Sequence, residues 1–294
     1  MLEMRGRQVN CLPGSTHVMG VLNVTPDSFS DGGQYLDVGL ALERARVMEA
    51  EGALFIDVGG ASSRPAGTVY GAGAEPVSAE TELERVLPVI RRIVRELPRV
   101  VVSVDTYRSE VAERVLDEGV HLINDITGLR HDPGLAKLAA HAGAALALMH
   151  SVGEVGGMPH AVSHENVAGE VATFLRTAAA TAVEAGVTSI LLDPGFGFGK
   201  SVADNFRLID QIDRFIALGH PVMIGVSRKS SVGAAVSLTA DAAPVDERLY
   251  GSLGATAVAV MRGASIVRTH DVKATAQMLR VMRKAAGLRV RGGA

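Results

Sequence analysis

The sequence predicts a single-domain α/β protein with the (β/α)8, or TIM-barrel, fold. Short apolar, β-branched segments alternate with longer segments of helical periodicity, and this alternation repeats eight times over 294 residues. No linker rich in Pro, Gly or Ser interrupts the pattern, so we expect one domain over residues 1–294, a length that barrels often reach as one unit. A doubly wound open sheet is the alternative that the same alternation allows.

The candidate strands are nearly continuous in apolar residues. Such strands are typical of a parallel sheet covered on both faces, whereas strands with one face in water alternate between apolar and polar residues. In chain order the candidates are Val18–Leu22, Leu54–Val58, Val100–Val104, His121–Ile123, Ala145–Met149, Ile190–Leu192, Val222–Val226 and Ile266–Val267.

Helices are predicted between these strands. Apolar residues recur at three- and four-residue steps over 38–48, 83–97 and 167–178. Asp37 is placed to cap the first helix, and Ser78 precedes the second. Two connections, 23–37 and 59–77, are long and rich in Gly and follow predicted strands. We expect both at the barrel mouth, because long loops in compact domains are usually functional.

Composition excludes several classes of protein. Hydrophobic residues make up 47% of the chain and charged residues 21%, which excludes a disordered or fibrous protein. The net charge of −3 gives no general attraction to nucleic acid or to an anionic membrane, so neither partner is expected. Cys11 is the only cysteine, which excludes an internal disulfide and a cysteine-based zinc cluster. The N-terminal residues lack the apolar core of a signal peptide, and we expect a cytoplasmic protein.

Nearly every predicted strand is followed by a polar residue at its carboxyl end, where barrels build their active sites. Asp57 and Asp125 could equally cap helices or brace loops. As a set, the strand ends predict carboxylates and amides on one side of a site and cations on the other. In chain order these residues are Asn23, Asp57, Asp105, Asn124 with Asp125, His150, Asp193, Ser227 to Lys229, and Arg268 with His270.

This division predicts a ligand with two chemically different ends. A carboxylate accepts two parallel hydrogen bonds from an N–C–N edge such as that of an aminopyrimidinone, and Asp105, Asn124 and Asp193 are the candidates for these contacts. The amide oxygen of Asn23 suits Mg²⁺, which takes oxygen ligands and shares its coordination with substrate phosphates. The candidates for binding phosphate are Arg64, Lys229, Arg268 and His270.

The segment GFGFGKS, residues 195–201, is similar to a phosphate-binding loop but does not match one. A Walker loop ending at this Lys-Ser pair needs glycine where Pro194 stands, and the GxGxxG pattern fails at Lys200. We interpret the segment as a tight turn after a strand, with Phe198 as a candidate wall for a ring. Phe196 and Phe198 could equally be ordinary packing residues.

Together these residues resemble the dihydropteroate synthases of bacterial folate biosynthesis. The resemblance extends from about residue 17 to residue 284 and rests on eight segments in register. They are GVLNVTPDSFSDGG (20–33), DVGG (57–60) with SRP (63–65), SVDT (103–106), INDI (123–126), LMH (148–150), DPGFGFGK (193–200), GVSRKS (225–230) and RTHDV (268–272).

The resemblance implies a TIM-barrel transferase that joins 6-hydroxymethyl-7,8-dihydropterin diphosphate to 4-aminobenzoate, with Mg²⁺ as cofactor. It also implies a homodimer and a target of sulfonamides. Its catalytic groups would be Lys229, Arg268 and His270, acting in a dissociative substitution without a covalent enzyme intermediate. The implied pterin-binding residues are Asp105, Asn124, Met149, Asp193, Phe198 and Lys229. The implied diphosphate-binding residues are Asn23 (through magnesium), Arg64, Arg268 and His270, and the aminobenzoate site would be lined by Ser63, Pro65 and Ser227.

The second long loop departs from the pattern of that family. Ala61 stands where the family has glutamate, Ser63 replaces threonine, Ala66 replaces glycine, and residues 67–73 are an apparent insertion. We therefore expect altered affinity for 4-aminobenzoate and for sulfonamides.

Three other functions remain as alternatives. They are a pterin-binding methyltransferase, a catalytically silent pterin-binding module and a Schiff-base aldolase using Lys229. The methyltransferase would not need the cationic cluster, and a silent module would be free to lose it. The aldolase would need a lysine of depressed pKa.

Overall fold

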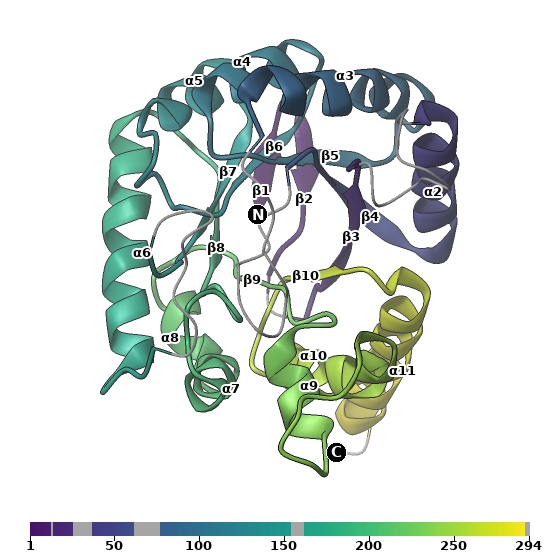
Figure 1. Ribbon diagram of the computed structural model, residues 1–294, viewed down its shortest axis with the longest axis vertical. Helices are drawn as coiled ribbons and strands as arrows, with labels where there is room; N and C mark the ends of the chain where they lie inside the picture. Colours follow the sequence, from purple (N-terminus) through teal and green to yellow (C-terminus); the bar gives the residue numbers. More distant parts are fainter. Residues whose placement is uncertain (13, 26–36, 62–76, 154–161, 292–294) are drawn as a thin grey trace.

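The computed structural model describes residues 1–12, 14–25, 37–61, 77–153 and 162–291, with side chains described as far as residue 285. Figure 1 shows parallel strands enclosed by helices. None of the helices in the described residues is long and apolar enough to cross a membrane.

The strands form a nearly closed parallel barrel, which confirms the (β/α)8 prediction. Their order in the sheet is β8-β7-β6-β5-β4-β3-β10-β9, and an isolated bridge from Leu192 to Val222 joins β8 to the β9 side. An open, doubly wound sheet would reverse its strand order in the middle, whereas here the ends of the sheet meet. The bounds are β3 (His17–Asn23), β4 (Ala53–Gly59), β5 (Val101–Asp105), β6 (Leu122–Asp125), β7 (Ala145–Met149), β8 (Ile190–Asp193), β9 (Met223–Ile224) and β10 (Ile266–Thr269).

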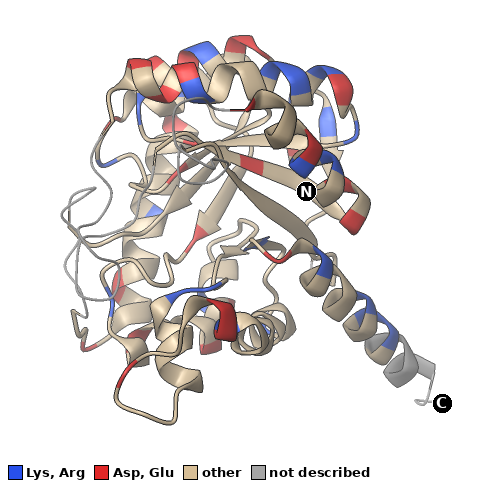
Figure 2. Cartoon of the chain, turned by 45° about the vertical axis from the view of Figure 1, so that its right-hand side comes forward, with Lys and Arg blue, Asp and Glu red and all other residues tan. Residues whose placement is uncertain are grey.

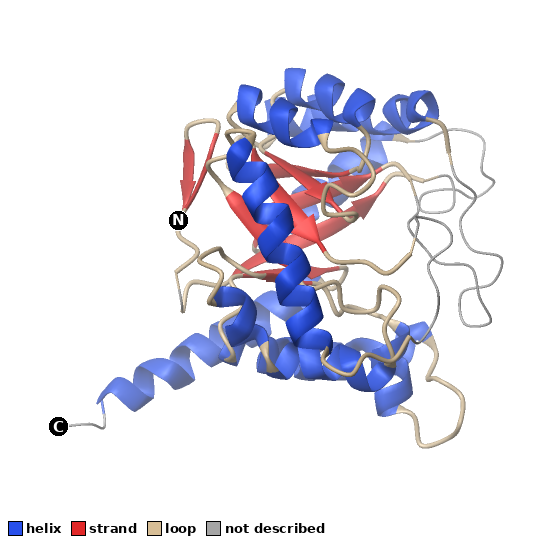
Figure 3. Cartoon of the chain, turned by 90° about the vertical axis from the view of Figure 1, so that its left-hand side faces the viewer, coloured by secondary structure: helices blue, strands red, loops and turns tan. Residues whose placement is uncertain are grey.

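Helices cover the outside of the barrel (Figure 3). Asp37 caps α2, accepting from the backbone N–H groups of Gly39 and Leu40 at 2.7 and 3.0 Å, and Ser78 caps α3, accepting from Thr81 N–H at 3.1 Å. The helices are α2 (Val38–Glu51), α3 (Ala79–Glu96), α4 (Ser109–Asp117), α5 (Gly134–Ala142), α6 (Val167–Glu184), α7 (Val202–Asp210), α8 (Ile212–Ile216), α9 (Ser230–Val236), α10 (Leu249–Met261) and α11 (Val272–Arg291), with a 3-10 turn at Val245–Arg248. Basic residues recur along α11, which begins against the barrel and extends away from it toward its C-terminal end (Figure 2).

The structure adds a hairpin that the strand pattern does not predict. Strands β1 (Leu2–Met4) and β2 (Arg7–Val9) pair antiparallel. Their buried side chains pack against the inward-facing apolar residues of the barrel, among them Phe55 and Leu122. Glu3 N–H donates to Ser189 Oγ at 2.8 Å, just before β8, so the hairpin covers the N-terminal end of the barrel. The opposite, C-terminal end is the one that carries the polar residues.

One strand is shorter than predicted. The segment expected over Val222–Val226 pairs as a strand only at Met223–Ile224. Many of the polar residues expected just after the strands are instead their last residues, including Asn23, Asp105 and Asp193. Their side chains are therefore held by the sheet itself.

Candidate active site

A hydrogen-bonded network at the C-terminal end of the barrel joins residues from four strands. Asp57 on β4 is fully buried, and its Oδ1 accepts from Ser103 Oγ at 2.5 Å. Its Oδ2 accepts from Asn124 Nδ2 at 3.0 Å and from Arg268 Nε at 2.7 Å. Arg268 Nη2 donates in turn to Asp105 Oδ2 at 3.0 Å. The arginine expected at the diphosphate thus lies directly against the residues expected at the pterin.

Burial shifts the acid–base behaviour of the carboxyl groups in this site. Desolvation raises the pKa of Asp105 to about 7, although the adjacent Arg268 acts to lower it. Burial also raises the pKa of Asp193, while Lys229 opposes that shift. Asp193 Oδ1 accepts from Gly195 N–H at 2.7 Å, which fixes its orientation at the end of β8. The two carboxyl groups that the sequence predicts to contact a heterocycle are therefore both of reduced acidity.

Lys229 lies between the anionic and aromatic parts of the site. It occupies the N-cap position of α9, and its Nζ donates to the Phe196 carbonyl and lies 4.3 Å from the centre of the Phe198 ring. Burial lowers the pKa of Lys229 to about 7, against the opposing charge of Asp193. Without a ligand, its charged and neutral forms are both populated near neutral pH.

Met149 and Phe198 form an apolar surface beside this network. They pack in one cluster with Ile126 and Tyr107. Phe196 is fully buried in the main core and makes an edge contact with Phe206, with ring centres 5.7 Å apart. The structure therefore distinguishes the roles of the two phenylalanines, which the sequence did not decide. Phe196 is a packing residue, and Phe198 lies beside the site.

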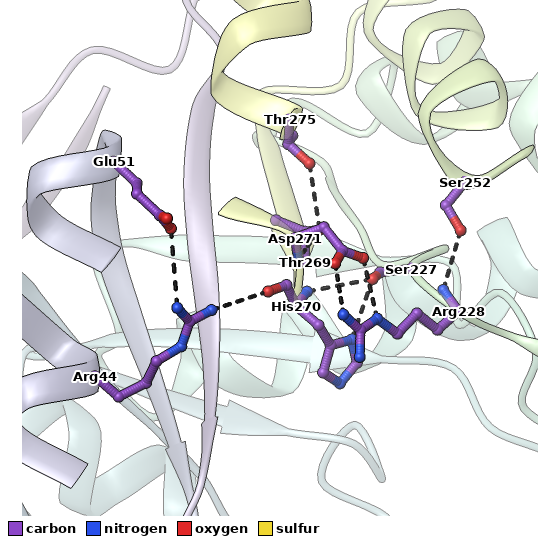
Figure 4. Close-up of polar contacts among 9 residues, drawn as sticks. All are labelled: Arg44, Glu51, Ser227, Arg228, Ser252, Thr269, His270, Asp271 and Thr275. Carbon is purple, nitrogen blue, oxygen red and sulfur yellow. Dashed lines mark hydrogen bonds and ion pairs between the residues drawn. The ribbon is translucent and has the colours of Figure 1, made fainter. Parts of the chain in front are cut away.

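His270 and Ser227 lie together at the ends of β10 and β9 (Figure 4). Ser227 Oγ is 3.1 Å from His270 Nδ1 and accepts from the His270 backbone N–H at 3.2 Å. Burial, reinforced by Arg268, lowers the pKa of His270 to about 4. His270 is therefore neutral at pH 7 in this structure, and it would bind a phosphate as a cation only on gaining a proton. Ser227, expected at the aminobenzoate site, lies beside a residue expected at the diphosphate.

The neighbouring residues brace this corner (Figure 4). Arg228 has a left-handed backbone, φ 61°, and donates to both carboxylate oxygens of Asp271 at 2.6 and 3.1 Å. Its backbone N–H donates to Ser252 Oγ at 3.1 Å, and Arg44 donates to the His270 carbonyl at 3.3 Å. The charge of Arg228 is thus already paired, whereas Lys229 beside it faces the site.

Asn23 is the last residue of β3 and is exposed at the mouth of the barrel. Among the described residues, no group of three or more His, Cys, Asp or Glu side chains could hold a metal ion. One amide oxygen fits a Mg²⁺ ion that takes its remaining ligands from substrate phosphates and water. Ser63, Arg64 and Pro65 lie outside the described residues, as do Ala66 and the apparent insertion 67–73.

Two residues of the site have roles that the sequence did not assign: Asp57, which was grouped with the polar strand ends but left open as a brace, and Lys200. The sequence left open whether Asp57 and Asp125 cap helices or brace loops. Asp125 braces a loop, because it accepts from the backbone N–H groups of Thr127 and Leu129 at 2.7 and 2.6 Å. Asp57 instead belongs to the hydrogen-bonded network of the site. Lys200 is buried and its Nζ donates to the backbone carbonyls of residues 195, 150 and 198 at 2.8, 3.2 and 3.2 Å.

These contacts explain why the Gly-rich segment is not a phosphate loop. The Lys200 ammonium holds the turn after β8 together and has three carbonyl partners inside the protein. The only available sequence signal for this role is a lysine at the end of a Gly-rich turn that directly follows an apolar strand.

Comparison with known proteins identifies the family to which the chain belongs. The profile of the family described as "Pterin binding enzyme" matches residues 19–270. Dihydropteroate synthase of Bacillus subtilis is 41% identical over 269 residues, covering 91% of this chain and 87% of the relative. The structure of Xanthomonas albilineans dihydropteroate synthase with 4-aminobenzoic acid has a TM-score of 0.85 at 38% identity and covers 97% of this chain and 98% of that one.

A further structure, dihydropteroate synthase from Thermus thermophilus in complex with 6HMPPP, has a TM-score of 0.77 at 39% identity, covering 96% of this chain and 98% of that one. The similarity thus extends over nearly the whole barrel and includes the strands that carry the network. The chain therefore belongs to the pterin-binding enzyme family, among the transferases known as dihydropteroate synthases.

Proposed function

We propose that this chain condenses 6-hydroxymethyl-7,8-dihydropterin diphosphate with 4-aminobenzoate, giving 7,8-dihydropteroate and diphosphate. The observation that carries the proposal is the position of Arg268, whose guanidinium lies against Asp57 and Asp105 at 2.7 and 3.0 Å. The cation that would stabilise the leaving diphosphate, Arg268, is thereby adjacent to the carboxylate side of the site, where the pterin heterocycle would be held. Relatives whose structures contain 4-aminobenzoic acid and 6HMPPP support the choice of substrates.

The reaction separates charge, and the site is arranged to stabilise both charges. The bond between the pterin methylene and the diphosphate oxygen breaks, and its electron pair leaves with the diphosphate. Arg268 and protonated Lys229 stabilise that negative charge, while Asp105 and Asp193 stabilise the positive charge left on the pterin. The amine of 4-aminobenzoate then forms the new C–N bond and loses a proton. Because the side chains act only by charge and hydrogen bonding, no covalent enzyme intermediate forms.

Mg²⁺ is part of the proposal. The Asn23 side-chain oxygen would provide a protein ligand at the mouth of the barrel. When bound to the diphosphate, the ion neutralises part of the charge on the leaving group.

The decisive experiment measures diphosphate release from purified protein, Mg²⁺ and the dihydropterin diphosphate, with and without 4-aminobenzoate. Release that depends on both substrates supports the synthase. Tight pterin binding without turnover would instead identify the catalytically silent module. As internal controls, Lys229→Ala should reduce turnover more than pterin affinity, whereas Asp193→Ala should reduce the affinity itself. A matching inhibition series with a sulfonamide tests the altered sensitivity expected from the second loop.

The homodimer implied by the resemblance is proposed to form through the face around α10. Tyr250 and Met261 on this helix are exposed apolar or aromatic side chains, 83% and 75% accessible. Beside them, a groove of about 250 Å³ between α7, α9 and α10 is lined mainly by apolar residues, including Phe206, Val232 and Val236. Light scattering on the purified chain should give twice the mass of one chain.

A further inference from the structure

Asp57 is one of the polar residues near the strand ends, but its role depends on contacts that the sequence does not reveal. It lies on β4, two residues before the strand ends, and is fully shielded from water. Three side chains from three other strands donate to it: Ser103 to Oδ1, and Asn124 and Arg268 to Oδ2. Because Asn124 and Arg268 are expected at opposite ends of the ligand, a single carboxylate oxygen controls the orientation of both.

The contact with Asp57 determines which end of the Asn124 amide faces a ligand. A carboxylate has no donor, so only the NH₂ group of Asn124 can point at it. The amide oxygen of Asn124 therefore points away from Asp57. That oxygen is buried and has no hydrogen-bond partner in the described part of the chain. An unpaired buried acceptor destabilises a fold by ~1–3 kcal/mol, so a ligand N–H that reaches it recovers that free energy.

Asp57 also restricts Arg268. The guanidinium donates from Nε to Asp57 and from Nη2 to Asp105. Two carboxylates therefore hold the same edge of the planar guanidinium group. A side chain held by two charge-assisted bonds has little freedom to reorient when a charged leaving group develops, which is the arrangement that favours catalysis.

We propose that Asp57 is a positioning and specificity-determining residue, which makes Asn124 present an acceptor to the heterocycle and aligns Arg268 with the departing diphosphate. This inference rests on the proposed function. It holds that Asp57, which does not itself contact the ligand, determines which edge of a heterocycle the site accepts. The edge selected is one with an N–H donor opposite Asn124. An edge with a carbonyl there would meet oxygen against oxygen.

The test compares two ligands of nearly the same shape by isothermal titration calorimetry. The probes are a pterin, which has a 2-amino group, and its 2-oxo counterpart, in which that donor is replaced by an acceptor. Wild-type protein should favour the amino compound. In Asp57→Asn, the new side-chain NH₂ can donate to the Asn124 oxygen, which lets the Asn124 amide turn over. The preference for the amino compound should then fall at least tenfold.

Ser103→Ala is the matched control. It removes a hydrogen bond to the same buried carboxylate but leaves the contacts with Asn124 and Arg268 in place. Its preference for the amino compound should stay within threefold of wild type. In steady-state kinetics Asp57→Asn should reduce kcat more than it raises KM for 4-aminobenzoate, because its effect on Arg268 concerns the leaving group. Equal loss of preference in both variants would show that Asp57 is merely structural.

Asn124→Asp provides a test that does not require Asp57→Asn to fold. It places two carboxyl groups within hydrogen-bond distance, so one of them must hold a proton and its pKa rises. Pterin affinity should then acquire a pH dependence in addition to that of wild type, in which Asp105 and Lys229 have pKa values of about 7, and a pH profile identical to that of wild type would overturn the inference. Failure of wild type to bind any pterin would instead refute the proposed function, so the two failures are distinguishable.

Discussion

Replacing Arg268 by methionine removes the guanidinium that two buried carboxyl groups share. The change keeps a side chain of similar length, so the main loss is electrostatic. Asp57 and Asp105 would each lose a charge-assisted hydrogen bond, of 2.7 and 3.0 Å. Such bonds contribute ~1.5–3 kcal/mol each to the free energy of unfolding. Removing one partner of a buried ion pair lowers that free energy by ~3–5 kcal/mol.

The free energy of unfolding should fall by about 3 kcal/mol at pH 8. This value is the lower end of the range, because the Arg268 side chain is still 21% exposed to solvent. At roughly 2 °C per kcal/mol for a chain of this size, Tm should fall by about 6 °C. The loss should depend on pH. The pKa of Asp105 in the folded protein is already raised to about 7, so stability from its protonated form is present in acid and is lost as pH rises through that value.

Arg268 limits this loss in the wild type by favouring the ionised form of Asp105. Without it, the pKa of Asp105 rises further and the loss continues to higher pH. The difference in unfolding free energy between variant and wild type should therefore be at least ~1 kcal/mol smaller at pH 5.5 than at pH 8.

Urea unfolding followed by circular dichroism at both pH values measures the effect. Arg262→Met is the control, because Arg262 pairs with Asp210 at 2.5 Å on the surface, where the two side chains are 50% and 64% exposed. Surface pairs contribute ~0–1 kcal/mol, so this variant should change little and equally at both pH values. A loss for Arg268→Met that is the same at both pH values, or larger at pH 5.5, would refute the reasoning.

Three further predictions concern other parts of the chain. The pKa of Lys229 is lowered to about 7 in the free protein, so kcat/KM for the dihydropterin diphosphate should fall above pH 7 as the ammonium loses its proton, and Lys229→Met should abolish that alkaline limb. Gly195→Ala would place a Cβ 1.8 Å from the His150 carbonyl oxygen at φ 71°, so we expect a loss of more than ~3 kcal/mol in thermal unfolding. Gly143→Ala, also at positive φ but with no atom within 4 Å, should lose only ~1–2 kcal/mol; equal losses would contradict the steric argument. Tyr250→Glu should reduce the light-scattering mass to that of one chain without unfolding it, and an unchanged dimer would place the interface elsewhere.

Local patterns predicted the barrel well because they arise from local causes. Continuous apolar strands, the capping residues Asp37 and Ser78, and helical periodicity each depend on a few neighbouring residues. The N-terminal hairpin was missed because its strands have three residues each, too few to show a period of two. Its stability comes from packing against the barrel interior, which is a tertiary effect.

The sequence predicted which residue types lie in the site, but it did not predict their protonation states. Strand ends of a parallel barrel meet at one end of the fold, so residues such as Asp193 and Arg268 could be grouped from the sequence. Their protonation could not be predicted in that way. His270 counted as a potential cation, yet burial beside Arg268 lowers its pKa to about 4.

The sequence by itself determined the fold class, the polar ends of the strands and the family, because each is written in residue types and their spacing. Only the tertiary structure decided that Asp57 and Asp125, both polar residues of a strand, have different roles: one orients Asn124 and Arg268, and the other accepts from its own loop. The physical reason is that a carboxylate acquires its role from the donors that surround it in space. Those donors come from strands up to 211 positions away along the chain.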